Sequence, residues 1–150
     1  MRELLLLGHI VFAIIWIGSH ILLIALGRRA SKGGPVKMVE FIGDSRWLAT
    51  RLQGPAAFLV LFCGVLLVVE DGFGFTDLWI ALALLGFATL LVVTATYLLP
   101  EYKQIIQLAE SYGADAPDAQ AKIRKVVQVM RIDSVVMIAI VLDMIIKPGL

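Results

Sequence analysis

Apolar residues gather along the chain into four long runs that are separated by polar segments. The runs cover about residues 4–26, 52–69, 78–99 and 127–146. Each is close to the roughly 20 helical residues that cross the hydrocarbon core of a bilayer. A helix satisfies its backbone hydrogen bonds within one segment, as a membrane span requires. The pattern therefore predicts an all-α fold, an integral membrane four-helix bundle that forms a single domain over residues 1–150.

Composition agrees with a chain whose main partner is the lipid bilayer. Hydrophobic residues make up 60% of the sequence, whereas soluble domains are usually nearer half apolar. The formal net charge is only +1, which argues against nucleic acid as a partner. The first run is too long for the apolar core of a signal peptide, so we expect it to be a retained helix.

The basic residues are distributed unevenly between the polar segments. Six lie between the first and second runs, and five lie between the third run and the apolar stretch 134–146. None lies between the second and third runs. Lys and Arg accumulate on the cytoplasmic side of a membrane. We therefore expect a multi-pass protein of the cytoplasmic (inner) membrane with its N-terminus and C-terminus outside, and with Trp79 at the outer interface.

The stretch GHIVFAIIWIGSHI in the first run contains both histidines of the chain, His9 and His20. They are eleven positions apart, which is three helical turns plus about 20°. They should therefore share one helix face, about 16.5 Å apart along the axis. Ala13 and Trp16 fall on the same face, and the neighbouring Gly18 would let a helix or a flat ring approach closely.

Ionisable residues inside a span are costly, and they usually face the bundle interior with a function or a partner. Neutral imidazole is an axial ligand of haem iron. The pattern thus predicts a site for haem b, with His9 and His20 as metal ligands and with Ala13 and Trp16 as walls of the ring pocket. The spacing is too long for both histidines to bind one iron, so it suits two haems, or one haem with the other histidine in a different role.

The second axial ligand has two candidate sources. One is the same helix of a second subunit in a homodimer, which would pair each histidine with its symmetry mate. The other is a methionine of the fourth run. Met144 belongs to a stripe of methionines that recur every seven residues, and it should lie at roughly the depth of His9.

Other interpretations of the same residues remain open. Asp143 should lie near the depth of His9 and Asp133 near that of His20, so each pair could form a polar clasp between the first and fourth helices. The same groups could relay protons or ions in a small transporter. A third alternative is a structural or assembly subunit of a membrane complex. No nucleotide-binding or nucleophile motif is present, and the question of an enzyme stays open.

Three short segments resemble those of small bacterial membrane proteins. HIVFAIIWIGSHILL places a tryptophan and a glycine seven and nine residues after His9. GPAAFLVLFCGVLLV has a proline-started span with a glycine in its middle, and IVLDMIIKPGL ends a last span in Lys-Pro. The nearest resemblance, over nearly the whole chain, is to an uncharacterised four-helix integral membrane family, a domain of unknown function. More distantly, the chain resembles the HemJ-type protoporphyrinogen oxidases and the CopD-type copper-resistance membrane domain.

The HemJ-type resemblance implies His9 as the first haem ligand. Those enzymes also carry a functional lysine in a later span, but the run 78–99 contains none, which departs from the pattern of an oxidase. The CopD-type resemblance implies copper handling, yet His, Met and Cys are not clustered here. From the histidine face and the HemJ-type resemblance, we expect a membrane b-type haem protein that serves redox or porphyrin chemistry, with a membrane redox partner.

Overall fold

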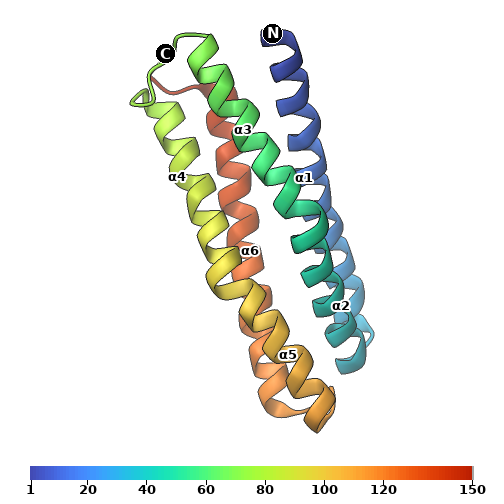
Figure 1. The fold of residues 1–150 in the computed structure, drawn as a ribbon. Coiled ribbons are helices and arrows are strands. Elements are labelled where there is room, and N and C mark those ends of the chain that lie inside the picture. The colour runs from blue at the N-terminus through green and yellow to red at the C-terminus, as the bar shows by residue number, and fades with distance from the viewer. Residues whose placement is uncertain (150) are drawn as a thin grey trace.

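The computed structural model describes residues 1–149, which form four long helices that run antiparallel to their neighbours (Figure 1). Two of these long helices consist of two α-helical parts joined by a π-helical turn. In chain order the elements are α1 (Arg2–Lys32), α2 (Pro35–Leu48), η1 (Ala49–Gln53), α3 (Gly54–Glu70), α4 (Leu78–Val93), η2 (Thr94–Leu98), α5 (Leu99–Tyr112) and α6 (Pro117–Ile146). The described residues contain no strand, so the all-α four-helix bundle is confirmed.

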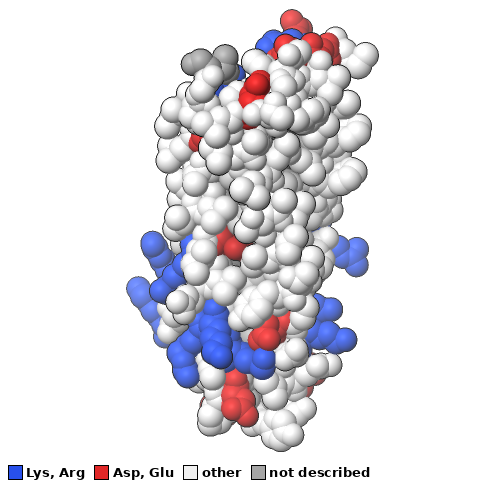
Figure 2. Space-filling view, turned by 90° about the vertical axis from the view of Figure 1, so that its left-hand side faces the viewer, with Lys and Arg blue, Asp and Glu red and all other residues white. Residues whose placement is uncertain are grey.

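The two ends of the bundle differ in what they contain. Both termini and the α3–α4 connection lie at one end, which we call the terminal end (Figure 1). The short connections after α1 and after α5 lie at the other end, which we call the basic end. Lys and Arg side chains gather in the half of the molecule near the basic end, whereas the other half shows a mostly uncharged surface (Figure 2).

The π-helical turns lie where prolines interrupt two long helices. Pro55 and Pro100 each come two residues after such a turn. Proline has no N–H to donate, and its ring clashes with the carbonyl group four residues earlier. A π turn takes in one extra residue and so relieves this clash without ending the helix. The second and third long helices therefore extend well past the predicted spans at the basic end.

Two hydrophobic clusters fill the interior. The cluster near the basic end is densely packed, with Ile42 and Ile105 fully buried. The cluster near the terminal end contains several alanines beside larger residues: Trp16, Ala56, Ala57, Val60, Ala83, Phe87, Leu90, Met137 and Ile140. In this half the main helix pairs are α1 with α3 and α4 with α6. The small side chains leave space between the two pairs.

The outer surface of the bundle is apolar on all four long helices. Leu4, Phe58, Leu85 and Val135, one from each long helix, are all at least 65% exposed. Water-soluble monomers rarely expose so much contiguous apolar surface. Hydrocarbon is the environment that suits these side chains, which agrees with the predicted membrane location.

Within residues 1–149, three helices are long and apolar enough to cross a membrane, namely Arg2–Lys32, Pro35–Glu70 and Leu78–Tyr112. The helix α6 is not among them, because Arg131, Asp133 and Asp143 interrupt its apolar half. It nevertheless packs along α4. The span predicted at 127–146 therefore stays a prediction.

Trp79 differs from its predicted place at the lipid interface. Its side chain is only 7% exposed, and its ring meets Phe73 edge-on with the ring centroids 5.4 Å apart. The ring thus faces the interior of the terminal end. An aromatic residue near the end of a span suits both the lipid interface and the interior of the bundle. The packing between helices decides which face of the helix turns inward.

Candidate functional site

A cavity of about 450 Å³ lies among the four helices in the half near the terminal end. Its walls are mostly apolar. Four residues predicted from the sequence to bind a cofactor line this one cavity: His9, Ala13, Trp16 and Met144. The first three come from α1 and the fourth comes from α6, so the structure brings the predicted wall and the predicted methionine together.

His9 is held in place by α3. Its Nδ1 lies 2.9 Å from the backbone carbonyl oxygen of Val60. A Cβ atom added to Gly64 would lie 3.0 Å from Cε1 of the His9 ring, so a side chain at that position would press on the imidazole. The helices also approach closely at Gly8, where an added Cβ would lie 3.2 Å from Sγ of Cys63. Small residues thus let α1 and α3 clamp the imidazole.

The bond to Val60 determines which nitrogen of His9 carries the proton. A carbonyl oxygen can only accept a hydrogen bond, so Nδ1 must be the donor. The neutral ring then has its lone pair on Nε2. Histidines that bind metals commonly donate their other N–H to a backbone carbonyl in this way. His9 therefore has the hydrogen-bonding pattern of a metal-ligating histidine on the wall of an apolar cavity.

Aromatic side chains form the deeper wall of the cavity. Trp16 is 7% exposed, and its ring packs against Phe87 with the centroids 5.0 Å apart and the planes tilted by 50°. Ala13 and Ala83 also line this wall and take up little room. The arrangement offers a water-poor pocket with flat apolar surfaces, as a planar ring would need.

His20 does not line this cavity. Gln53 Nε2 donates a hydrogen bond to His20 Nδ1 over 3.2 Å, so the lone pair of that nitrogen is already used. The two histidines therefore lie in different surroundings, and the cavity near the terminal end contains only His9. The sequence predicts that a helix or a flat ring could approach closely at Gly18. No described residue does so, because an added Cβ there would meet nothing within 4 Å.

The predicted clasps between histidines and aspartates are absent from the described part of the chain. His9 bonds to Val60 and His20 bonds to Gln53, both on the second long helix rather than on α6. Asp133 is instead buried on α6, at only 5% exposure.

Several residues at the terminal mouth of the cavity were not predicted as part of a site. Lys147 extends over the rings of Phe73 and Trp79, and Arg2 pairs with Asp71 over 2.6 Å. All five line the cavity. Nothing in the sequence pattern indicates that Lys147 and Arg2 lie at the mouth of one cavity. Their meeting depends on how the helix ends are arranged, which periodicity within one helix does not reveal.

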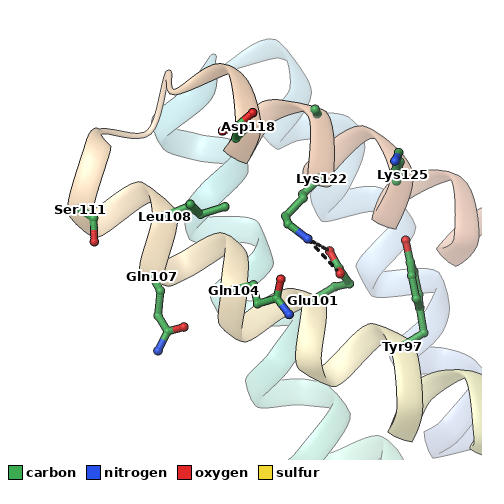
Figure 3. A pocket seen from close by; sticks show the side chains of 10 residues that line it. Tyr97, Glu101, Gln104, Gln107, Leu108, Ser111, Asp118, Lys122 and Lys125 are labelled. Carbon is green, nitrogen blue, oxygen red and sulfur yellow. Dashed lines mark hydrogen bonds and ion pairs between the residues drawn. The ribbon is translucent and has the colours of Figure 1, made fainter.

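A second hollow, of about 680 Å³, lies between α5 and α6 near the basic end. Figure 3 shows Lys122 of α6 reaching across it to Glu101 of α5, with Nζ 2.9 Å from Oε2. The residues that line it are Tyr97, Glu101, Gln104, Gln107, Leu108, Ser111, Asp118, Ala121, Lys122 and Lys125. These include no histidine or sulfur ligand. The ion pair ties α5 to α6, and we assign this hollow no chemistry.

Among residues 1–149, no group of three or more His, Cys, Asp and Glu side chains could hold a metal ion. A metal that the chain held through one histidine would therefore need most of its ligands from elsewhere. A porphyrin, which supplies four nitrogens in its plane, has this property.

Comparison with known proteins identifies the family. Residues 3–148 match the family described as "Predicted integral membrane protein (DUF2269)". No curated protein and no solved structure matches the chain. The expected membership of an uncharacterised membrane family is confirmed, whereas the likeness to HemJ-type and CopD-type proteins stays an interpretation. The chain thus belongs to the integral membrane family DUF2269.

Proposed function

We propose that this integral membrane protein binds haem b in the cavity near the terminal end and serves redox or porphyrin chemistry. The hydrogen bond from His9 Nδ1 to the Val60 carbonyl carries this proposal. It leaves Nε2 as the lone-pair nitrogen of a residue that lines an apolar cavity. Imidazole in this tautomer is a common axial ligand of haem iron.

The cavity suits a cofactor in volume and in chemistry. Its volume of about 450 Å³ falls in the range of roughly 300–1,000 Å³ that is typical of small-molecule sites. Trp16 and Phe87 would pack against the ring, and Ala13 would leave room for its edge. Such walls exclude water and lower the local dielectric, which are two means by which a protein tunes a haem potential.

Met144 supports a site contained within one subunit. It lines the same cavity from α6, whereas His9 lines it from α1, and a thioether is the second axial ligand in cytochromes c. His9 is turned toward α3 and the interior, so pairing it with a symmetry mate would require a different orientation. The homodimer therefore becomes a separate prediction, and His20 is left out of the proposed ligand set.

The haem would supply one-electron chemistry, and the chain would supply the ligand and the surroundings. His9 would hold the iron, Val60 would orient His9, and the aromatic wall would fix the ring. Electron exchange with a membrane redox partner is the simplest use of such a site. We also place the basic end in the cytoplasm and both termini outside the inner membrane, on the basis of the charge distribution.

Absorption spectroscopy of the detergent-purified protein tests this function. We expect a Soret band and sharpened bands after reduction with dithionite. His9→Ala should abolish these bands, because it removes the proposed iron ligand. His20→Ala is the matched control and should keep them, since His20 lies outside the cavity. The haem proposal fails if protein from haem-replete cells is colourless and also takes up no added hemin.

One observation favours a second candidate, a proton pathway. Asp133 is buried, and Asp143 Oδ2 is buried with no hydrogen-bond partner among residues 1–149. Carboxyl groups inside a span commonly mark proton routes. If the spectra are negative, proton flux into liposomes that is lost in Asp133→Asn would support this candidate. Flux equal to that of empty liposomes would exclude it.

A further inference from the structure

We propose that Lys147 and Trp79 form an anion-binding rim at the terminal mouth of the cavity, which takes the carboxylate end of an amphipathic ligand. The apolar body of the ligand would fill the cavity below. For the identity of that ligand the inference rests on the proposed haem function, in which the carboxylates are the two propionates at one edge of the ring.

The backbone after α6 places Lys147 at this mouth. Lys147 follows the last residue of α6 and has a left-handed conformation, with φ of 47°. Its N–H caps the helix by donating to the Asp143 carbonyl oxygen over 2.8 Å. The side chain then lies over two rings, with Nζ 5.0 Å from the Trp79 centroid and 5.8 Å from that of Phe73.

The two cationic residues at this mouth differ in whether their charge is compensated. Arg2 donates to both carboxylate oxygens of Asp71, over 2.6 and 3.3 Å. Among residues 1–149, no acidic side chain forms a salt bridge with Lys147. The charge available to a ligand at the mouth is therefore that of Lys147, while the Arg2–Asp71 pair joins the start of α1 to the end of α3.

Trp79 adds a hydrogen-bond donor beside this charge. Its side chain is more than nine-tenths buried and lines the cavity, and its Nε1 has no hydrogen-bond partner in the described part of the chain. A buried donor without a partner is unfavourable, so an acceptor brought within its reach gains a hydrogen bond. A carboxylate, with two acceptor oxygens, can satisfy both the ammonium group and the indole N–H.

The rest of the cavity defines the direction in which such a ligand would lie. The deeper wall contains Trp16 and Phe87, and among the described residues the only Lys or Arg side chains that line the cavity, Arg2 and Lys147, lie at its terminal mouth. His9 follows Arg2, the first residue of α1, by seven residues. This spacing places it about 10.5 Å along the helix axis from the terminal end. The carboxylates would therefore face the terminal end, and the centre of the ring would lie deeper, toward His9.

The test compares hemin with hemin dimethyl ester, whose propionates carry no charge, in titrations of the purified protein. Lys147→Gln should weaken hemin binding by about tenfold, which is the loss of one good charge-assisted contact. It should leave the affinity for the ester within about twofold. Trp79→Phe, which keeps an aromatic ring and removes the donor, should also weaken hemin more than the ester. Lys103→Gln, an exposed lysine near the basic end, is the control and should change neither affinity.

The outcomes separate this inference from the haem proposal. If Lys147→Gln weakens the binding of hemin and of the ester equally, or weakens neither, the rim proposal is overturned. The haem function still stands in that case if the Soret band is lost in His9→Ala. If neither porphyrin binds, the haem function fails, and the rim is tested with a pyrene-labelled fatty acid and its methyl ester. The rim proposal stands if Lys147→Gln weakens the binding of the fatty acid and leaves the binding of its methyl ester unchanged. Any other result with these two probes would overturn it.

Discussion

His9 acquires its orientation from two features of α3, one backbone atom and one missing side chain. The Val60 carbonyl fixes the tautomer, and Gly64 leaves the space that the ring occupies. Val60 lies within α3, where a carbonyl oxygen already accepts one hydrogen bond from the backbone of its own helix. Val60 can accept this additional bond because a carbonyl oxygen has two lone pairs.

Gly64→Ala tests this arrangement. The added Cβ would lie 3.0 Å from Cε1 and 3.2 Å from Nδ1 of His9, so the ring must move by a few tenths of an ångström. We expect haem affinity to fall by about tenfold, equivalent to roughly 1.4 kcal/mol, because axial ligation depends on ring position. Hemin titration followed at the Soret band measures this. Gly18→Ala meets nothing within 4 Å and serves as the control; equal affinities in the two variants would contradict the proposed clamp.

Sequence periodicity could predict those site residues that share one helix. His9, Ala13 and Trp16 follow from the 100° turn of α1, and Met144 follows from an estimate of depth. Val60, Gly64, Trp79 and Lys147 could not be predicted, because their roles depend on the register between helices. The same stripe predicts His20 as a further ligand, of a second haem or in a different role beside one haem. The stripe does continue, but at that depth the second long helix presents Gln53 to it.

At the scale of helices, each pair in the half near the terminal end meets at a glycine. In the α4–α6 pair, a Cβ added to Gly86 would lie 2.8 Å from Cγ1 of Ile140. Small residues at helix interfaces in membranes allow backbones to approach closely, and packing is a principal source of association there. The α4–α6 pair therefore depends on this position as the α1–α3 pair depends on Gly8 and Gly64.

Gly86→Ala should lower the free energy of unfolding by about 1–3 kcal/mol, as overpacking commonly does. Thermal unfolding in one detergent, followed by circular dichroism, measures the change. Gly43→Ala is the matched control, since that glycine lies within α2 and an added Cβ meets nothing within 4 Å. It should raise stability by about 0.5–1 kcal/mol through helix propensity. A melting point for Gly86→Ala at or above that of the wild type would show that the contact does not limit packing.

At the scale of the whole molecule, the apolar runs predicted the number of long helices and their antiparallel order. The amphipathic pattern after Pro100 predicts that the third helix continues past this proline, whereas the pattern before Pro55 predicts a separate short helix, which η1 instead joins to α3. Local rules make proline a helix breaker in most contexts, and the π turns before Pro55 and Pro100 remove that conflict. The continuous helices build the half of the bundle near the basic end, and the apolar cavity that His9 lines lies in the other half.

The orientation of the bundle in the membrane decides which compartment the mouth of the cavity faces. Thr76 in the α3–α4 connection and Ser111 near the end of α5 are exposed at opposite ends of the molecule. The native Cys63 is buried and should not react. In intact spheroplasts, a membrane-impermeant maleimide should label Thr76→Cys but should label Ser111→Cys only after lysis. The reverse pattern would place the basic end outside, against the charge rule. With the expected pattern, Lys147 and the ligand carboxylates would face the outer side, so a redox partner or a porphyrin would meet the site from there.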